Sequence, residues 1–360
     1  MKRILINQSY IAQRVTGQQR YASEIARRLE EAGATGIRPG KVWSNSKILV
    51  WAWVQLVFPL VSRGATVLSL TSRAPFWFRR QVVVVHDLFV LTNPEWYSRL
   101  YVWTHAPLLR AQLRSAAAVV AVSQPVADQV SRLRSEPVQV APNAPSDVFR
   151  RPHADEEDAA LARRGLEPDR YFLAVGSRDP RKNLPRLVEA YGRLSHEDRL
   201  RFPLVVVGGG AAIYRDECID WPVGSVDAGY VPDDELRVLY RHARSFVFVT
   251  RAEGFGLPLV EAAAAGCRHF VVSDIEVFRW VCGENARYTD PTSVADIAGA
   301  LRREIDDPEQ QELDLERFDW DASAAVIEDV CRRVSGDRCA GSPDHRRGRP
   351  RLRRSPEAPC

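Results

Sequence analysis

The sequence predicts an α/β protein that contains two doubly wound parallel sheets joined by a linker. Short, fully apolar runs of strand length alternate with helical segments, which is typical of parallel sheets covered by helices on both faces. The alternation stops near residue 150 and restarts near residue 171. A chain of 360 residues is also longer than one hydrophobic core usually organises, so two units of about 150 residues each are expected.

The first half of the chain contains four expected strands and one clear amphipathic helix. The strands are expected at residues 4–7, 65–70, 81–85 and 116–122. Residues 18–32 are expected to form a helix, because Tyr21, Ile25 and Leu29 recur four residues apart and therefore share one face.

The most apolar stretch lies at residues 48–61 and reads ILVWAWVQLVFPLV. Its 14 residues are too few to cross a bilayer, which requires about 20, and Gln55 and Pro59 interrupt it. Two interpretations fit this length and pattern: a helix buried in the core, or an interfacial helix that docks on a membrane.

The second half repeats the alternation after a linker. Residues 150–168 carry Pro152, Pro168 and an acidic run, so we expect a linker with a short helix there. Strands are expected at 171–175, 204–207, 228–231, 246–250 and 269–273, and helices at 184–194, 233–243 and 257–265. In such sheets the ligand binds in the crevice at the carboxyl ends of the strands.

The formal net charge of +4 hides an uneven distribution along the chain. Residues 1–150 hold 19 Lys and Arg against 8 Asp and Glu, residues 151–335 hold 24 against 35, and residues 336–360 hold 7 against 3. The first half therefore suits an anionic partner, such as a phosphate-bearing ligand or a membrane face. Residues 336–360 lack apolar periodicity and are expected to be a disordered basic tail that is solvated or contacts a polyanion or membrane.

The composition argues against several classes of protein. The six cysteines show no CxxC motif and no His/Cys cluster at metal-ligand spacing, which excludes structural zinc and a secreted disulfide framework. The first ten residues lack the apolar stretch of a signal peptide, so a cytoplasmic location is expected. Nucleic acid is not an expected partner, because the tail lacks interleaved aromatics and the basic residues of the first half are dispersed.

Two of the expected strands end in glycine-containing loops where a backbone can approach a phosphate. The first loop contains Gly176, Ser177, Arg178, Arg181 and Lys182. Arg181 and Lys182 immediately precede a helix, so their positive charges and the positive end of the helix dipole converge on one spot. A basic loop that merely caps the helix would have the same composition. The second loop contains Gly208 but lacks the spacing of a dinucleotide fingerprint.

A third loop follows the strand expected at 246–250 and leads into a helix with Pro258 in its first turn. Backbone N–H groups at this helix start are offered by Gly254, Phe255, Gly256 and Leu257. Glu253 lies beside these donors and Glu261 lies one turn into the helix. Such a pair suits a ligand with hydroxyls and a diphosphate, since carboxylates accept sugar O–H bonds and amides bind the anion. Alternatively, Glu253 is a cap and Glu261 a surface helix residue.

These motifs resemble the signature of glycosyltransferase family 4, retaining enzymes with the GT-B fold of two facing Rossmann-like domains. The segment EGFGLPLVE, in which seven residues separate Glu253 and Glu261, carries the resemblance, and VGSRDPRKN with Lys182 resembles the family's diphosphate loop. Residues 16–21 (TGQQRY) look like the glycine-rich first loop, and Val85-His86-Asp87 looks like the His-Asp strand end. The resemblance covers roughly residues 1–334.

The resemblance also implies a domain arrangement. An acceptor-side domain is expected at residues 1–150, a linker at 151–168 and a nucleotide-sugar-binding domain at 169–317. A helix at 318–335 would cross back to the first domain, followed by the basic tail at 336–360.

Individual residues acquire expected roles from the same resemblance. Glu261 would bind the nucleotide ribose and Glu253 a hydroxyl of the donor sugar, while the amides of residues 255–257 would hold sugar and phosphate. Lys182 would stabilise the charge that develops on the departing diphosphate. His86 would lie near the donor sugar from the first domain.

The sequence departs from the family pattern at three places, the first of which is Asn143-Ala144, where the family usually has Asn-Gly before the linker. Gly17 would let the backbone approach the diphosphate. Ser177 stands where the family often has an arginine, so diphosphate binding is expected to depend more on Lys182, Arg178 or Arg181. Trp280 stands where relatives often have Glu, which argues against a polar role there.

A metal ion is not expected to be essential. Asp319-Trp320-Asp321 is a nominal DxD, the metal-binding mark of the other main glycosyltransferase fold. It lies at the start of the last helix, where Asp is explained as an N-cap, and no carboxylate cluster follows a strand. No cofactor is expected besides the nucleotide sugar, which is a co-substrate.

The resemblance, together with the lack of a metal-binding carboxylate cluster, therefore implies a retaining, metal-independent glycosyltransferase of bacterial polysaccharide synthesis. It would move a hexose or deoxyhexose of mannose, rhamnose or glucose type from a nucleotide sugar to a hydroxyl of a saccharide or lipid-linked saccharide. The alternatives are a sugar-nucleotide epimerase or hydrolase of the same fold, and a non-catalytic binding subunit. The basic first half is expected to contact the inner face of the cell membrane peripherally.

Overall fold

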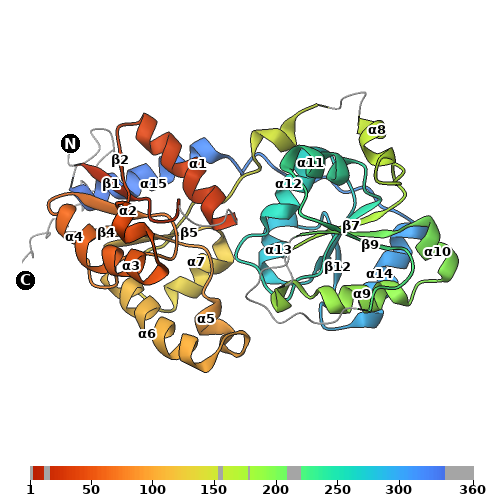
Figure 1. Ribbon diagram of the computed structural model, residues 1–360, viewed down its shortest axis with the longest axis horizontal. Coiled ribbons are helices and arrows are strands. Elements are labelled where there is room, and N and C mark those ends of the chain that lie inside the picture. The colour runs from red at the N-terminus through yellow and green to blue at the C-terminus, as the bar shows by residue number, and fades with distance from the viewer. Residues whose placement is uncertain (1–2, 12–16, 153–156, 177–178, 209–219, 337–360) are drawn as a thin grey trace, which may run out of the picture.

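The computed structural model describes residues 3–11, 17–152, 157–176, 179–208 and 220–336, and two separate six-stranded parallel sheets form its framework (Figure 1). The strand order is β2-β1-β3-β4-β5-β6 in the first sheet and β12-β11-β10-β7-β8-β9 in the second. We call each sheet with its covering helices a lobe. In each sheet, successive strands of the chain are added first on one side and then on the other. This switch point lies between β1 and β3 in the first sheet and between β7 and β10 in the second, and ligands of such sheets bind at these switch points.

The central strands are buried because they are runs of Val, Ile, Leu and Phe covered on both faces. The first sheet consists of β1 Ile4–Asn7, β2 Thr35–Ile37, β3 Thr66–Ser69, β4 Gln81–Val85, β5 Ala118–Ala121 and β6 Gln139–Val140. The second sheet consists of β7 Phe172–Val175, β8 Leu204–Val207, β9 Ser225–Gly229, β10 Ser245–Phe248, β11 Phe270–Ser273 and β12 Arg287–Thr289.

Helices cover both sheets. In the first lobe they are α1 Gly17–Glu31, α2 Lys41–Ser44, α3 Lys47–Ala52, the π-helix η1 Trp53–Val57, α4 Phe58–Val61, α5 Phe89–Thr92, η2 Pro94–Trp96, α6 Arg99–Ser115 and α7 Gln124–Ser131. Between the lobes and in the second they are η3 Asp147–Arg150, α8 Glu157–Ala162, η4 Pro180–Lys182, α9 Leu184–Gly192, α10 His196–Arg201, α11 Asp233–Arg241, α12 Leu257–Ala265, α13 Glu276–Cys282 and α14 Val294–Asp306.

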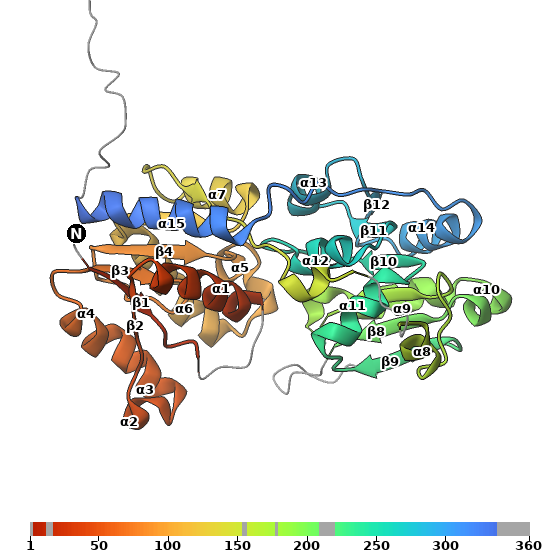
Figure 2. The same ribbon diagram turned by 90° about the horizontal axis from the view of Figure 1, so that it is seen from above.

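The last helix, α15 Trp320–Ser335, lies on the first lobe although it follows the second lobe in sequence (Figure 2). It packs beside α1, and the Ser323 hydroxyl donates to the Pro142 carbonyl. The Asp319 carboxylate accepts from the Ala322 amide, so the N-cap expected from the sequence is present. Except for Gly336, the predicted tail lies outside the described residues.

The apolar stretch at residues 48–61 is half buried. One side of α3, η1 and α4 packs inward through residues such as Trp53, Val54 and Phe58. The buried Gln55 side chain donates to the Ala74 carbonyl and accepts from the Phe76 amide, which explains a polar residue in this run. The opposite side is exposed, so the stretch is not the fully buried helix that one interpretation predicts. Among the described helices, none has the length and apolarity needed to cross a bilayer.

The structure differs from the expected elements mainly at the sheet edges. The strand expected at 228–231 is β9, Ser225–Gly229, because the polar edge residues Ser225 and Asp227 pair with β8. The edge strands β2, β6 and β12 were not expected from the sequence, since each has only two or three residues. Short, half-buried edge strands carry little apolar signal.

Candidate functional site

Lys182 and Glu253 meet where the second sheet reverses its strand order. Lys182 ends η4 beyond β7, and Glu253 follows β10, the neighbour of β7. The Lys182 Nζ lies 2.7 Å from the Glu253 Oε1, and the Arg181 Nη1 lies 3.1 Å from the Oε2. Asn183 fixes the turn with a left-handed φ of 60° and side-chain bonds to the carbonyls of Val249 and Pro291. The basic loop thus does more than cap a helix: it binds the carboxylate of the neighbouring loop.

Burial and neighbouring charges act in opposite directions on this pair. Burial has the largest effect on the pKa of Lys182, which lies below its ordinary value although Glu253 raises it. For Glu253, burial raises the pKa, but Lys182 and Arg181 outweigh it and hold the pKa below the ordinary value. Glu253 is therefore an ionised carboxylate held by two cationic side chains. Ionisable groups whose pKa values are shifted by burial and by a specific charged partner are typical of functional sites.

Arg181 connects this cluster to the first lobe. Its guanidinium pairs with Asp179 and lies 5.0 Å from the centre of the Phe89 ring on α5. The half-buried carboxyl of Asp87, two residues beyond the end of β4, interacts electrostatically with this guanidinium. Burial raises the pKa of Asp87 above its ordinary value, while Arg181 opposes the rise. Asp87 thus places a half-buried acid of the first lobe near Arg181.

The loop at Gly254 is pressed against the first lobe. A methyl group built on Gly254 would lie 1.8 Å from the His86 carbonyl oxygen, so only glycine allows this approach. The Ser123 hydroxyl donates to the Gly254 carbonyl at 2.6 Å. Beyond this contact Gly256 is the N-cap residue of α12, and its φ of 95° favours glycine. The start of α12, with its N–H groups, therefore faces the first lobe.

Phe255 contributes to this loop through its backbone, because its side chain is buried away from the cleft. The Phe255 ring packs edge-to-face on Trp280 and Phe318. Trp280 is thus part of an aromatic cluster, in agreement with the expectation that it has no polar role. Leu257, the first residue of α12, is half-buried and lies 3.8 Å from where a methyl group on Gly17 would stand. Gly17 and the start of α12 therefore face each other at the interface of the two lobes.

Glu261 is buried on α12, so the alternative interpretation that it is a surface residue of this helix is wrong. Its Oε1 accepts a hydrogen bond from the Arg20 Nη1 of α1 at 3.0 Å. Burial raises the pKa of the Glu261 carboxyl to about 7, and Arg20 opposes this rise. Glu253 is likewise not the cap of α12, because Gly256 occupies the N-cap position.

His86 is a packed histidine at the cleft wall. Its Nε2 lies 2.9 Å from the Leu70 carbonyl, and its ring meets Tyr21 edge-to-face at 5.0 Å. Burial lowers the pKa of His86 to about 4, so the ring is neutral at physiological pH and Nε2–H donates to Leu70. The His86 carbonyl, rather than its ring, makes the contact with Gly254.

Other predicted residues surround this centre or lie outside the described chain. Gly176 follows β7, and a methyl group there would lie 3.3 Å from the Lys182 Cγ. Gly208 follows β8 and donates its amide to the Gly229 carbonyl. Ser177 and Arg178 lie outside the described residues, so their placement stays a prediction. Among the described residues there is no group of three His, Cys, Asp or Glu side chains that could hold a metal ion.

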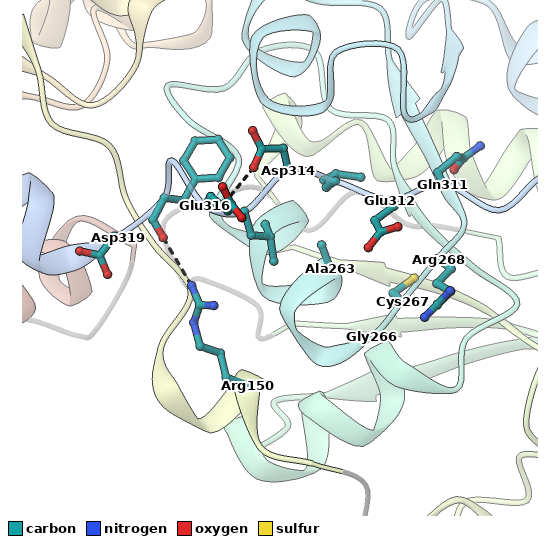
Figure 3. Close-up of a pocket in the computed structure, with 13 residues that line it drawn as sticks. Arg150, Ala263, Gly266, Cys267, Arg268, Gln311, Glu312, Asp314, Glu316 and Asp319 are labelled. Carbon is teal, nitrogen blue, oxygen red and sulfur yellow. Dashed lines mark hydrogen bonds between the residues drawn. The ribbon is translucent and has the colours of Figure 1, made fainter.

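A cavity of about 840 Å³ lies at the other end of α12 (Figure 3). It is lined by Ala263 and Gly266 of that helix end, by Arg150 and by the segment at residues 311–319 that leads into α15. Its lining carries four acidic side chains, Glu312, Asp314, Glu316 and Asp319. Two arginines, Arg150 and Arg268, also line it, so acidic side chains outnumber basic ones by two. This excess of negative charge makes the cavity a poorer site for a diphosphate than the Lys182 loop.

Two side chains at the cleft were missed in the sequence, namely Arg20 as a partner of Glu261 and Asp87 as a partner of Arg181. Arg20 stands on an amphipathic helix, where a solvated arginine is the ordinary expectation. Only the placement of the two lobes brings it to Glu261, and no sequence pattern encodes a contact across 241 residues.

Comparisons with known proteins agree with this geometry. The chain is 30% identical over 268 residues to the O-antigen chain mannosyltransferase B of Escherichia coli, which covers 69% of this chain and 68% of the relative. A sucrose-phosphate synthase from Thermosynechococcus elongatus has a similar structure, with a TM-score of 0.71, 17% identity and coverage of 93% of this chain and 100% of that chain. Anabaena HepE in complex with UDP and glucose has a TM-score of 0.64 and 15% identity, and the match covers 92% of this chain and 95% of that chain.

The solved structures confirm the predicted fold, in which two Rossmann-like lobes face each other as in GT-B glycosyltransferases. The family model described as glycosyl transferases group 1 matches residues 157–314 and so includes the loops of Lys182, Glu253 and Glu261. With a relative that is similar along more than two thirds of both chains, this match shows that the chain belongs to the group 1 glycosyl transferases.

Proposed function

We propose that this glycosyltransferase moves a hexose or deoxyhexose from a nucleotide sugar to a hydroxyl of a saccharide or lipid-linked saccharide, with retention of anomeric configuration. The observation that carries the proposal is the ionised Glu253 carboxylate held by Lys182 and Arg181 at the switch point of the second sheet. The Escherichia coli relative is an O-antigen chain mannosyltransferase, which supports mannose as the first sugar to test and a bacterial polysaccharide as the acceptor class.

Each side chain of the cleft has a proposed role. Lys182 and Arg181 bind the diphosphate and stabilise the charge that grows on it as the glycosidic bond breaks. Glu253 accepts hydroxyls of the sugar, and Glu261 accepts hydroxyls of the ribose. The amides at the start of α12 bind phosphate with the positive end of the helix dipole.

The first lobe closes this site. Gly17 lies opposite the start of α12 and would admit the diphosphate to its backbone, while Ser177 and Arg178 complete the phosphate loop from the second lobe. Neutral His86 borders the sugar, and the tight contact of its carbonyl with Gly254 excludes water that would otherwise hydrolyse the donor.

A resident metal ion is not part of the proposal. The cations Lys182 and Arg181 already supply positive charge where the diphosphate would lie. We therefore expect transfer to continue at an unchanged rate in excess EDTA. Activity that disappears with EDTA and returns with Mg²⁺ or Mn²⁺ would contradict this part of the proposal.

The catalytic assignment is tested by Lys182→Ala and Glu253→Ala. Loss of an electrostatic contact to a developing charge typically costs about 100-fold to 1,000-fold in kcat. The matched control is Arg287→Ala, which removes a buried ion pair with Glu304 of 2.6 Å in the same lobe, away from the cleft. Near-normal transfer by either cleft variant would refute the assignment.

Product analysis in the same assay distinguishes the reaction classes. A retaining transferase yields a glycoside with the anomeric configuration of the donor, which proton NMR reads directly. Free nucleotide and free or epimerised sugar formed at the full rate without an acceptor would instead indicate the hydrolase or epimerase alternative.

We further propose that the first lobe attaches peripherally to an anionic membrane through an apolar ridge, formed by Ile48, Trp51, Leu56, Leu60 and Val61. These side chains of α3, η1 and α4 are exposed. In Figure 2, α4 lies at the end of the first lobe remote from the second, and α3 projects from the lower side of the first lobe. Between Glu31 and Asp87 the chain carries seven Lys and Arg and no acidic residue. Exposed apolar side chains within a wholly cationic stretch suit a membrane interface with anionic lipid.

Vesicle sedimentation tests this attachment. We expect binding to vesicles with phosphatidylglycerol that weakens as salt is raised, and binding at least about tenfold weaker for Trp51→Ser combined with Leu56→Ser. The control is Leu200→Ser on α10, because Leu200 and Leu56 are equally exposed, at 60%. Binding that ignores ionic strength, anionic lipid and the ridge variant would refute this attachment and leave the catalytic proposal intact.

A further inference from the structure

Arg20 is the cation that joins the first lobe to the Glu261 side of the cleft. It stands in the first turn of α1, and its Nη1 and Nη2 reach the Glu261 Oε1 at 3.0 Å and the Asp233 Oδ2 at 2.8 Å. Its Nη1 also donates to the Ser146 hydroxyl at 3.3 Å. The guanidinium lies 5.8 Å from the centre of the Phe149 ring. One side chain of the first lobe therefore binds carboxylates on both α11 and α12 of the second.

These contacts are well suited to control whether the Glu261 carboxyl is ionised. Its side chain is only 7% exposed, so water stabilises the carboxylate little and the neighbouring charges decide. Within the described chain, the facing groups are Arg20 of α1 and Asp233 and Tyr240 of α11. Asp147 and Arg150 belong to η3, which packs on α11 and α12, but both side chains are exposed. Asp233 repels the carboxylate and Arg20 attracts it, so Arg20 is the counter-charge of Glu261.

We propose that Arg20 is a positioning residue that binds and orients the Glu261 carboxyl for the nucleotide ribose, and thereby couples donor binding to closure of the two lobes. Arg20 binds Oε1, so Oε2 is the oxygen directed to the ribose hydroxyls. When the lobes open, Glu261 loses its counter-charge and becomes a weaker acceptor. The nucleoside is thus bound best in the closed arrangement, in which the acceptor side is also in place. This inference rests on the proposed ribose role of Glu261.

Because the protonation state of Glu261 affects its bonds to the ribose, donor binding should depend on pH in a specific way. Burial raises the pKa of Glu261 to about 7 even with Arg20 in place. A neutral carboxyl accepts hydroxyl protons less well than a carboxylate, so nucleotide affinity falls as pH decreases through this pKa. Removal of Arg20 takes away the influence that lowers this pKa, and the fall in affinity moves to higher pH.

The experiment measures the dissociation constants of UDP and GDP by calorimetry between pH 5.5 and 9, with wild type, Arg20→Met, Arg20→Lys and Glu261→Gln. For the nucleotide that binds, we expect Arg20→Met to weaken binding about tenfold at pH 7 and to move the acid fall upward by about one pH unit. Arg20→Lys should restore the position of the fall, since it returns the charge. Arg28→Met is the control on the same helix, because Arg28 pairs with Glu24 and Asp321 away from the cleft.

The outcomes separate this inference from the function on which it rests. If Glu261→Gln binds nucleotide like wild type, the ribose role of Glu261 is wrong. If Glu261→Gln weakens binding and removes the pH dependence, but Arg20→Met keeps the wild-type affinity and pH profile, the role of Arg20 is wrong. A uniform weakening in Arg20→Met with an unmoved pH profile would show a merely structural contact and would also overturn the inference.

Discussion

Replacement of Gly254 by alanine should separate the lobes and stop transfer without unfolding the protein. The added methyl carbon would lie 1.8 Å from the His86 carbonyl oxygen and 2.9 Å from its carbon, whereas such contacts essentially never fall below 3.0 Å. The φ of Gly254 is not in the left-handed region, so backbone strain is not the cause. The Gly254 loop and the end of β4 must therefore move apart by more than 1 Å, from 1.8 Å to at least 3.0 Å.

A displacement of about 1 Å between reacting groups can cost about 100-fold in rate, and an incompletely closed cleft admits water. We therefore expect kcat/KM for transfer to fall about 100-fold and the hydrolysed fraction of the donor to rise. Calorimetry should show a nucleoside diphosphate affinity within about tenfold of wild type, because most proposed contacts come from the second lobe. Gly40→Ala is the control, since its methyl group would meet nothing within 4 Å among the described residues. Transfer by Gly254→Ala within about threefold of wild type would refute the role of this contact.

Three further predictions concern the cleft. Gly17→Ala should keep the melting temperature, because among the described atoms its methyl group would meet only Leu257, at an ordinary contact distance of 3.8 Å. It should raise the donor KM about tenfold, because the methyl group would intrude on the diphosphate. An unchanged KM would place the donor elsewhere. The folded protein keeps a proton on Glu261 up to about pH 7 that the unfolded chain releases near 4.5, so stability from this group is lost as pH rises through 7. Urea unfolding should show this loss in wild type and not in Glu261→Gln. Ser123→Ala should lower the free energy of unfolding by about 1 kcal/mol, since Ser123 caps α7 and binds Gly254; no change would show that neither bond matters.

Helices and strands were largely predictable where the sequence carries one strong hydrophobic pattern. The bounds of β1, β8 and α12 match the expected ranges, because apolar runs and a proline in the first helical turn mark them plainly. The same holds for the face of α1 that Tyr21 and Leu29 bury. The edge strands were missed because they are short, and pairing with a neighbour rather than their own composition makes them strands.

The site was predictable only within the second lobe. The loops of Lys182 and Glu253 follow strands that are neighbours in the sheet, so their meeting follows from the expected topology. The contacts of Arg20 with Glu261 and of His86 with Gly254 depend on how two separately built lobes face each other. That arrangement is the sum of many contacts between lobes, including the return of α15 to the first lobe, and no single motif encodes it.

A crystal structure of the protein soaked with the nucleoside diphosphate that binds would test the central proposal most directly. We expect the diphosphate within hydrogen-bonding distance of Lys182 and the start of α12, and the ribose hydroxyls on Glu261. A nucleotide bound elsewhere, such as in the acidic cavity at the far end of α12, with Lys182 and Glu253 still paired and untouched, would contradict it.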